Sequence, residues 1–197
     1  MGNLRSVSKA LEHVAPKDRV LVTADPQAIR SADKVVVPGQ GAMPDCMRQL
    51  AMSGARDAVV EAARTKPFLG LCIGLQMLFE RAEEGDTACL GIFEGTVPRF
   101  GGVAMRGLKI PQKGWNRVDQ SGNHAMWQNV PDGTWFYFVH SYYVAPRDGA
   151  IRAATCEYGT PFTCAVARDN IFAVQFHPEK SAAAGLQLLS NFVRWRP

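Results

Sequence analysis

No apolar run in this chain of 197 residues approaches the ~20 residues that a helix needs to cross a bilayer, which excludes a membrane-spanning protein. The beginning of the chain also has none of the pattern of a secretory signal, in which a charged end precedes an apolar middle and a small-residue cleavage site. Basic residues exceed acidic ones by only four and are scattered, so nucleic acid is not an expected partner.

Cysteines are few and do not occur in pairs. The five are odd in number, widely separated and form no CxxC motif, which argues against both a disulfide framework and a zinc site. We therefore expect a reducing cytoplasm as the location, and neither a metal nor a cofactor. The cysteines are Cys46, Cys72, Cys89, Cys156 and Cys164.

The remaining composition is that of an ordinary globular protein, with 47% hydrophobic and 20% charged residues. At this length the chain can bury a full core while staying within the range of one domain. No internal repeat, low-complexity tract or linker interrupts it. We expect a single domain over residues 1–197.

Helix and strand patterns alternate in the first half of the chain, which implies parallel strand pairing with helices on both faces of a sheet. Shorter β-prone runs follow from residue 90 and predict antiparallel or mixed strands. Helices are predicted at residues 4–14, 54–64, 73–82 and from about residue 186 onward, with a short helical turn led by Pro26. Strands are predicted at residues 19–23, 34–37, 68–71, 109–111, 135–140, 151–156, 162–168 and 171–176.

A cysteine stands at the corner between the strand at residues 68–71 and the helix that follows it. Residues 70–74 read Gly-Leu-Cys-Ile-Gly, so a glycine lies two positions to either side of Cys72, where a Cβ would clash. This is the pattern of a nucleophile elbow with sulfur in place of oxygen, and the start of a helix favours the thiolate. An arbitrary cysteine is more often an inert buried residue, and we interpret the other four in that way.

His177 and Glu179 end the last predicted strand. Residues two apart in an extended segment point to the same side, so the imidazole and the carboxylate can touch. They would supply a general base and the acid that orients it, completing a Cys-His-acid triad with the nucleophile first in the chain. A surface His-Glu pair at a strand end is common, so this motif carries weight only in combination.

The glycine-rich loop at residues 38–41 follows a buried strand and could present backbone N–H groups toward Cys72 as an oxyanion hole. A plain turn would have the same sequence. The expected oxyanion-hole residues are Gly39, Gln40 and Ile73. Among the other histidines, His13 and His124 are expected in solvent, and His140 is either structural or close to a polar ligand.

Three segments together resemble the signatures of the triad (class I) glutamine amidotransferases, in the same order and spacing: residues 38–41, 70–76 and 175–179. Residues 109–116, 138–143 and 177–181 also resemble the glutaminase subunits of imidazole glycerol phosphate synthases, which are enzymes of histidine biosynthesis. The likeness covers essentially the whole chain.

This resemblance implies an α/β fold of three layers, with a central, mostly parallel sheet flanked by helices and a smaller antiparallel or mixed sheet. It implies hydrolysis of glutamine at Cys72 through a thioester, with His177 as base and acid and Glu179 orienting it. It also implies a heterodimer with a separate (β/α)8-barrel cyclase subunit, which would use the ammonia to make imidazole glycerol phosphate and AICAR. The residues implied to bind glutamine are Gly41, Gln76, Ser141 and Tyr142.

Two features depart from the family pattern. Family members begin with a hydrophobic strand, and residues 1–6 match the segment that comes directly after that strand. We expect a chain without this strand to be less stable than one that carries it, because backbone groups would be left unpaired. Lys113 stands where an apolar residue is usual, which affects the packing of a partner-facing loop and leaves the triad untouched.

Three alternatives remain open from the sequence. One is a glutaminase subunit that serves anthranilate or aminodeoxychorismate synthesis, which shares the triad but usually lacks the patterns around Trp115 and His140. Another is a catalytically impaired regulatory subunit, in which the missing strand prevents assembly of the oxyanion hole. A cysteine hydrolase or peptidase is disfavoured, because the acid lies only two residues beyond the histidine.

Overall fold

The computed structural model describes residues 2–197; Met1, the first residue of the segment that matches the family pattern after the opening strand, lies outside them. None of the helices within residues 2–197 has both the length and the apolar character that a membrane crossing requires. The helices are α1 (Gly2–Val14), α2 (Pro26–Ser31), α3 (Met43–Met52), α4 (Arg56–Thr65), α5 (Ile73–Gln76) and α6 (Ala182–Arg194). Short 3-10 turns are η1 (Glu84–Asp86), η2 (Val103–Met105), η3 (Ala125–Trp127), η4 (Gly149–Ile151) and η5 (Pro178–Lys180).

The main sheet has six strands in the order β1-β2-β12-β11-β10-β7. Its first three strands are parallel and the rest pair antiparallel, so the expected α/β class is confirmed with a sheet that is parallel in one half. The strands are β1 (Val35–Gly39), β2 (Phe68–Cys72), β12 (Ile171–Val174), β11 (Thr160–Arg168), β10 (Arg152–Tyr158) and β7 (Asp119–Gln120).

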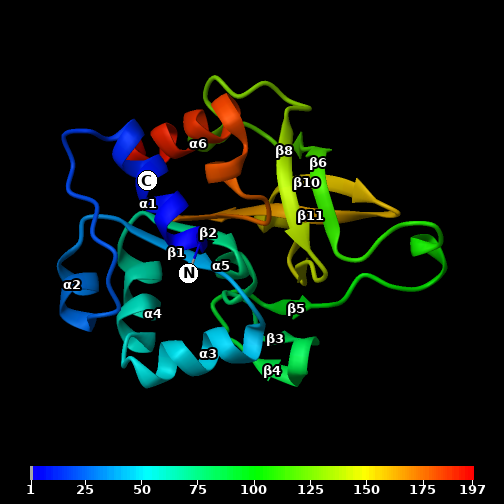
Figure 1. Ribbon diagram of the computed structural model, residues 1–197, viewed down its shortest axis with the longest axis horizontal. Coiled ribbons are helices and arrows are strands. Elements are labelled where there is room, and N and C mark those ends of the chain that lie inside the picture. The colour runs from blue at the N-terminus through cyan, green and yellow to red at the C-terminus, as the bar shows by residue number, and fades with distance from the viewer. Residues whose placement is uncertain (1) are drawn as a thin grey trace.

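Two smaller sheets extend the molecule beyond the main one. A four-stranded sheet has the order β4-β3-β5-β9, and a two-stranded antiparallel sheet joins β6 to β8. In Figure 1 the β6–β8 pair stands at the end of the molecule away from α2. The strands are β3 (Arg81–Ala82), β4 (Thr87–Ala88), β5 (Gly95–Val97), β6 (Gln112–Arg117), β8 (Trp135–His140) and β9 (Ala145–Pro146).

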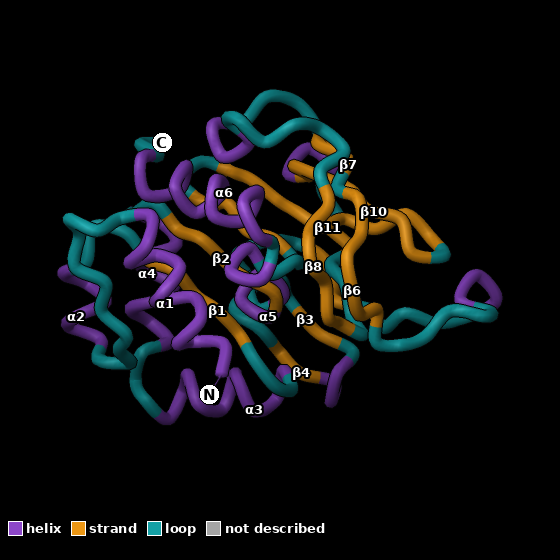
Figure 2. The backbone as a smooth tube through the Cα atoms, turned by 45° about the horizontal axis from the view of Figure 1, so that its top comes forward, coloured by secondary structure: helices purple, strands orange, loops and turns teal. Residues whose placement is uncertain are grey.

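Helices cover both faces of the parallel half, because alternate strand residues point to opposite sides. Leu69 and Leu71 of β2 join a core cluster with residues of α1 and α6, whereas Phe68 and Cys72 join the cluster that contains α4. Figures 1 and 2 show this layering, with α1 and α6 over one face and α3 and α4 on the other. The three-layer prediction is therefore confirmed.

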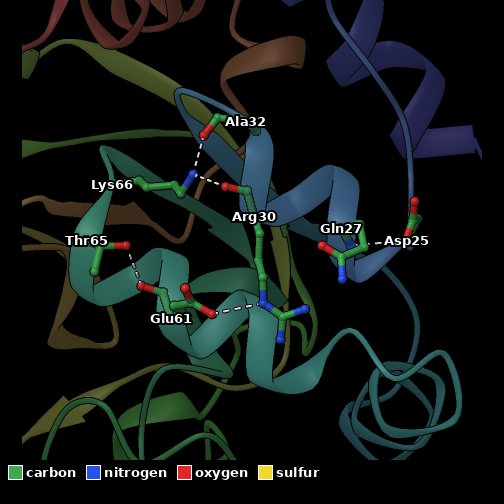
Figure 3. A network of polar contacts seen from close by, with 7 residues as sticks. All are labelled: Asp25, Gln27, Arg30, Ala32, Glu61, Thr65 and Lys66. Carbon is green, nitrogen blue, oxygen red and sulfur yellow. Dashed lines mark hydrogen bonds and ion pairs between the residues drawn. The ribbon is translucent and has the colours of Figure 1, made fainter.

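A polar network ties α2 to α4 (Figure 3). Asp25 caps α2 by accepting the backbone N–H of Gln27, and Arg30 donates to Glu61 of α4 at 3.0 Å. Lys66, just after α4, donates to the carbonyl oxygens of Arg30 and Ala32 at the end of α2. These contacts hold the end of α2 beside the end of α4, just ahead of β1.

The strand predicted at residues 19–23 is wrong. This segment has no regular secondary structure and belongs to no strand, and Leu21 and Val22 expose more than half of their surface. A groove of about 1310 Å³ separates it from β1, which is the edge of the main sheet. A β-prone sequence forms a strand only where a neighbouring strand supplies hydrogen-bond partners. Because the groove lies between them, residues 19–23 do not pair with β1.

Two further predictions were wrong in extent. The helix predicted at residues 73–82 stops at Gln76, because Leu78 and Phe79 close tighter i→i+3 bonds and Arg81 then pairs with β5. The strand predicted at residues 109–111 begins instead at Gln112, after a cis bond at Pro111. Helix α3 was not predicted, since its exposed residues blur the apolar periodicity.

Candidate active site

Cys72 is the last residue of β2 and the N-cap of α5, and its backbone has φ 55 and ψ −109. A non-glycine residue rarely adopts a positive φ, which is a strained conformation that folded proteins keep mainly at functional positions. The side chain is buried, with 6% of its surface exposed. The predicted sharp corner at Cys72 is confirmed.

Three glycines allow the chain to fold this tightly around the sulfur. A Cβ on Gly74 would lie 1.8 Å from the carbonyl oxygen of Val37, and one on Gly70 would lie 2.8 Å from the carbonyl oxygen of Gly74. A Cβ on Gly39 would lie 2.3 Å from the side chain of Ile73. The predicted clash is confirmed, and it shows that β1, β2 and α5 meet with no room for side chains.

His177 follows β12 and lies at the carboxyl end of the parallel strands, as Cys72 does. Its Nδ1 is 2.8 Å from Oε1 of Glu179, so the predicted contact between ring and carboxylate is confirmed. The backbone conformation differs from the prediction, because Glu179 lies in the 3-10 turn η5 rather than in an extended strand.

The charge state of His177 follows from its surroundings. Burial alone would lower the pKa of His177, but hydrogen bonds to Cys72 and Glu179 outweigh it and raise that pKa to about 9. Since Nδ1 is engaged by Glu179, Nε2 is the atom left for the sulfur. The imidazole therefore carries a proton at neutral pH, next to the sulfur of Cys72.

The loop at residues 38–41 lies beside Cys72, because the parallel register of β1 and β2 places Gly39 opposite Cys72. The carbonyl of Gln40 accepts a hydrogen bond from the thiol of Cys46, and Gly41 is exposed with φ 99. Ile73 opens α5, where the first backbone N–H groups have no partner within the helix. The proposed oxyanion residues are thus adjacent to Cys72.

Gln76 and Tyr142, both predicted to bind substrate, are brought together. The side-chain N–H groups of Gln76 are donated to the carbonyl of Tyr142 at 3.0 Å and to Oε1 of Gln175 at 2.9 Å. A ligand could therefore engage this amide only through its oxygen. Ser141 precedes Tyr142, and its carbonyl accepts the N–H of Phe100.

Gln175 is a site residue to which the sequence assigned no role. It is fully buried, and its Nε2 is 3.6 Å from the sulfur of Cys72. One signal in the sequence could have indicated it. Gln175 is a polar residue inside the run 171–176, whose other members are all apolar and buried, and buried polar groups are kept only where they find partners.

The remaining histidines and cysteines have structural surroundings. His124, expected in solvent, instead stacks on Phe172 with 4.9 Å between ring centroids, and burial lowers its pKa. His13 is exposed as expected. All five cysteines are free thiols, and Cys46 is half-buried whereas the other four are buried. Within residues 2–197 no three His, Cys, Asp or Glu side chains gather as a metal site would require.

Comparisons with known proteins point to one family. The family described as glutamine amidotransferase class-I matches residues 3–195. The imidazole glycerol phosphate synthase subunit HisH of Dechloromonas aromatica is 61% identical over 202 aligned residues, covering 100% of this chain and 94% of that protein. The HisH subunit of Nitrosospira multiformis is 60% identical, covering 100% of this chain and 95% of that protein.

Solved structures with low sequence identity share the fold. A protein of Thermoplasma acidophilum, described as a putative GMP synthase subunit, superposes with a TM-score of 0.70 at 17% identity, over 96% of this chain and 85% of that one. The glutaminase domain of a Trypanosoma brucei CTPS gives a TM-score of 0.61 at 16% identity, over 98% of this chain and 89% of that one. The chain belongs to the class-I glutamine amidotransferases and, within them, to the family of the imidazole glycerol phosphate synthase subunit HisH.

Proposed function

We propose that this chain hydrolyses the side-chain amide of glutamine at Cys72 and delivers the ammonia to a separate cyclase subunit that makes imidazole glycerol phosphate and AICAR. The observation that carries the proposal is a strained cysteine corner whose sulfur is hydrogen-bonded to His177, which is itself paired with Glu179. The names of relatives that are 58–61% identical favour this synthase over the anthranilate and aminodeoxychorismate alternatives.

The first half-reaction uses the proton that His177 already holds. The thiolate of Cys72 attacks the amide carbon of glutamine, and a carbon–sulfur bond forms while the carbonyl oxygen becomes an oxyanion. The proton on Nε2 of His177 passes to the amide nitrogen, so that the carbon–nitrogen bond breaks and ammonia leaves. A thioester and a neutral imidazole remain.

The second half-reaction reverses the role of the imidazole. Neutral His177 takes a proton from a water molecule whose oxygen attacks the thioester carbon, and the carbon–sulfur bond breaks to restore the thiolate. Glutamate leaves and loses its own proton to solvent. Glu179, whose Oε1 lies 2.8 Å from Nδ1, keeps the ring oriented and stabilises the protonated state in which the ring begins and ends the cycle.

Developing negative charge on the substrate oxygen would be stabilised by backbone N–H groups of Ile73 and of the loop containing Gly39 and Gln40. The close approach of Gly39 to Ile73 supports this assignment, because it brings both segments to one side of Cys72. Helix α5 has only four residues, so its dipole adds little, and the individual N–H groups carry the effect.

We assign the docking face of the cyclase subunit to the exposed side of the β6–β8 sheet. Trp115 and Trp135 on this side expose 48% and 56% of their surface, and Trp115 packs against Tyr137. The carbonyl of Tyr137 accepts the backbone N–H of His177, so the face adjoins the catalytic residues. Lys113, predicted in a loop, is exposed on β6 of this face and would suit an acidic partner.

The decisive experiment for this function is a glutaminase assay of the wild type and of Cys72→Ala, each with the cyclase subunit and its ligand. Wild type should release glutamate and Cys72→Ala should not. A glutamine-analogue electrophile should form a covalent adduct on Cys72, which also tests the alternative of a regulatory subunit without an oxyanion hole. Glutamate release that survives the substitution would overturn the mechanism. A cytoplasmic location follows as part of this proposal.

A further inference from the structure

The sulfur of Cys72 is contacted by a second buried group besides the imidazole. Nε2 of Gln175 lies 3.6 Å from Sγ, within the range of a hydrogen bond to sulfur. Gln175 is 0% exposed, and its backbone N–H is donated to the carbonyl of Cys164 at 2.8 Å, so the residue is fixed from behind by β11. A polar side chain buried this deeply has few orientations open to it.

The orientation of the Gln175 amide is determined by its neighbours. A backbone carbonyl can only accept, so the contact of Gln76 with the carbonyl of Tyr142 requires the NH2 group of Gln76 to point there. The same NH2 group is 2.9 Å from Gln175, which must therefore present its oxygen to Gln76. The NH2 group of Gln175 is then directed at the sulfur of Cys72.

The carbonyl of Tyr142 is held in turn by His140. Nδ1 of His140 is 2.7 Å from this carbonyl and must donate to it, which leaves Nε2 as an acceptor. Burial lowers the pKa of His140 to about 4, so the ring stays neutral and this arrangement persists at neutral pH.

The side chains in this chain of contacts are buried. Gln76 and His140 expose 3% and 6% of their surface, and Gln175 exposes none.

We propose that Gln175 is a positioning residue for the nucleophile: it donates an N–H to the sulfur of Cys72, and a buried chain through Gln76, the Tyr142 carbonyl and His140 keeps that N–H turned toward the sulfur. Its meaning for catalysis rests on the proposed glutaminase function. The bond stabilises the thiolate and holds it in the direction of attack, and Gln76 and the nucleophile become parts of one rigid unit.

The test compares the reactivity of Cys72 in the wild type, Gln175→Met and Gln175→Asn. Met retains the length of the side chain without the amide, and Asn retains the amide but withdraws it from the sulfur. Alkylation by iodoacetamide is followed separately at each cysteine by peptide mass spectrometry, with the half-buried Cys46 as the internal reference. The matched control is Asn191→Asp, which alters a buried amide that bonds the carbonyls of Met126 and Gln128.

We expect both Gln175 variants to alkylate Cys72 about tenfold more slowly than wild type relative to Cys46, the loss expected for one hydrogen bond to a charged group. With the cyclase subunit, kcat should fall about tenfold while KM stays within about twofold, because the bond acts on the nucleophile. Asn191→Asp should lose thermal stability without changing Cys72 alkylation. Folded Gln175 variants that alkylate Cys72 at the wild-type rate would overturn the proposal.

The hydrogen bond can also be tested in the wild type, in case the Gln175 variants do not fold. Alkylation of Cys72 should shift the side-chain NH2 resonance of Gln175 in NMR spectra, and an unshifted resonance would refute the bond. Failure of the proposed function is distinguishable, because it would appear as a wild type without glutaminase activity. Alkylation of Cys72 needs no glutamine and reads the positioning alone.

Discussion

At the scale of single residues, the central feature is a histidine whose surroundings favour its charged form. His177 is buried, which by itself opposes charge, yet its bonds to Cys72 and Glu179 raise its pKa from the ordinary 6.5 to about 9. On the proposed mechanism, the proton that the leaving nitrogen needs is therefore in place before glutamine arrives. The acidic neighbour contributes through electrostatics as well as through orientation.

Removing the charge of Glu179 tests this reasoning. In Glu179→Gln the pKa of His177 should fall from about 9 toward or below 6.5, because burial is then opposed only by the contact with Cys72. Glutaminase kcat should fall by about 10²-fold or more, since a neutral ring cannot protonate the leaving nitrogen. NMR titration of the His177 ring measures the shift, and Glu61→Gln, at an exposed pair with Arg30, is the control.

The same pKa shift predicts a dependence of stability on pH. Because the folded pKa of His177 lies above its unfolded value, its protonation stabilises the fold fully below about pH 6.5 and this contribution disappears as the pH rises through about 9. The difference in unfolding free energy between wild type and Glu179→Gln should therefore be largest at about pH 6 and shrink toward about pH 9.5. Denaturant unfolding at both pH values measures it, and a difference that grows with pH would contradict the assignment.

At the scale of elements, the site depends on three segments that meet without side chains between them. The backbone of α5 touches β1 at Gly74, and β1 touches the start of α5 at Gly39. The corner at Cys72 is strained, and strain of this kind persists only when the surrounding structure over-determines it. Close packing of backbone against backbone provides that constraint.

Gly74→Ala should therefore damage both the fold and the reaction. The new Cβ would meet the carbonyl of Val37 at 1.8 Å, and a clash with backbone must be relieved by moving β1 or α5. We expect a loss of at least about 2 kcal/mol, or roughly 4–8 °C in melting temperature, together with loss of Cys72 alkylation. Gly101→Ala is the control, because Gly101 is exposed with nothing within 4 Å of a Cβ. Equal melting temperatures for the two variants would contradict this account.

The corner and the strands around it could be predicted because their signals are local. Glycines around Cys72 and an unbroken apolar run at residues 68–71 indicate a buried strand and a tight turn without knowledge of the rest of the chain. Residues 19–23 carry an equally β-prone pattern, yet whether they form a strand depends on a neighbour that no local pattern reveals. The contact of Gln175 with Cys72 joins residues 103 positions apart and could not be read from spacing.

The groove between residues 19–23 and β1 leads to a prediction of its own. A short hydrophobic strand added ahead of residue 1 should pair with the open edge of β1 and cover the apolar lining of the groove. We expect the melting temperature to rise by about 2–4 °C for each kcal/mol by which the extension increases the free energy of unfolding. An extension of equal length made of Gly and Ser is the control, and coinciding melting temperatures for the two extended chains would refute the pairing.

At the scale of the whole molecule, the proposed catalytic residues adjoin the proposed docking face, because the backbone N–H of His177 is donated to the carbonyl of Tyr137 on β8. The inner side of the β6–β8 sheet packs Phe136 and Phe138 into the core, and its outer side exposes tryptophan. His140 lies on the inner side, paired in register with Gln112. One thin sheet thus separates the proposed docking face from the polar chain that reaches Cys72, and on the proposed function this would place the released ammonia close to the partner.

The docking face can be tested independently of catalysis. Trp115→Ala and Trp135→Ala should each weaken binding of the cyclase subunit by about tenfold or more, because large aromatic side chains that become buried at the centre of an interface carry most of its energy. Met52→Ala is the matched control, since Met52 is 79% exposed at the end of α3 and lies outside this face. Isothermal titration calorimetry measures the three affinities. If all three variants bind as wild type does, the cyclase subunit docks on another surface, and the ammonia must leave the site by a route that does not cross the β6–β8 sheet.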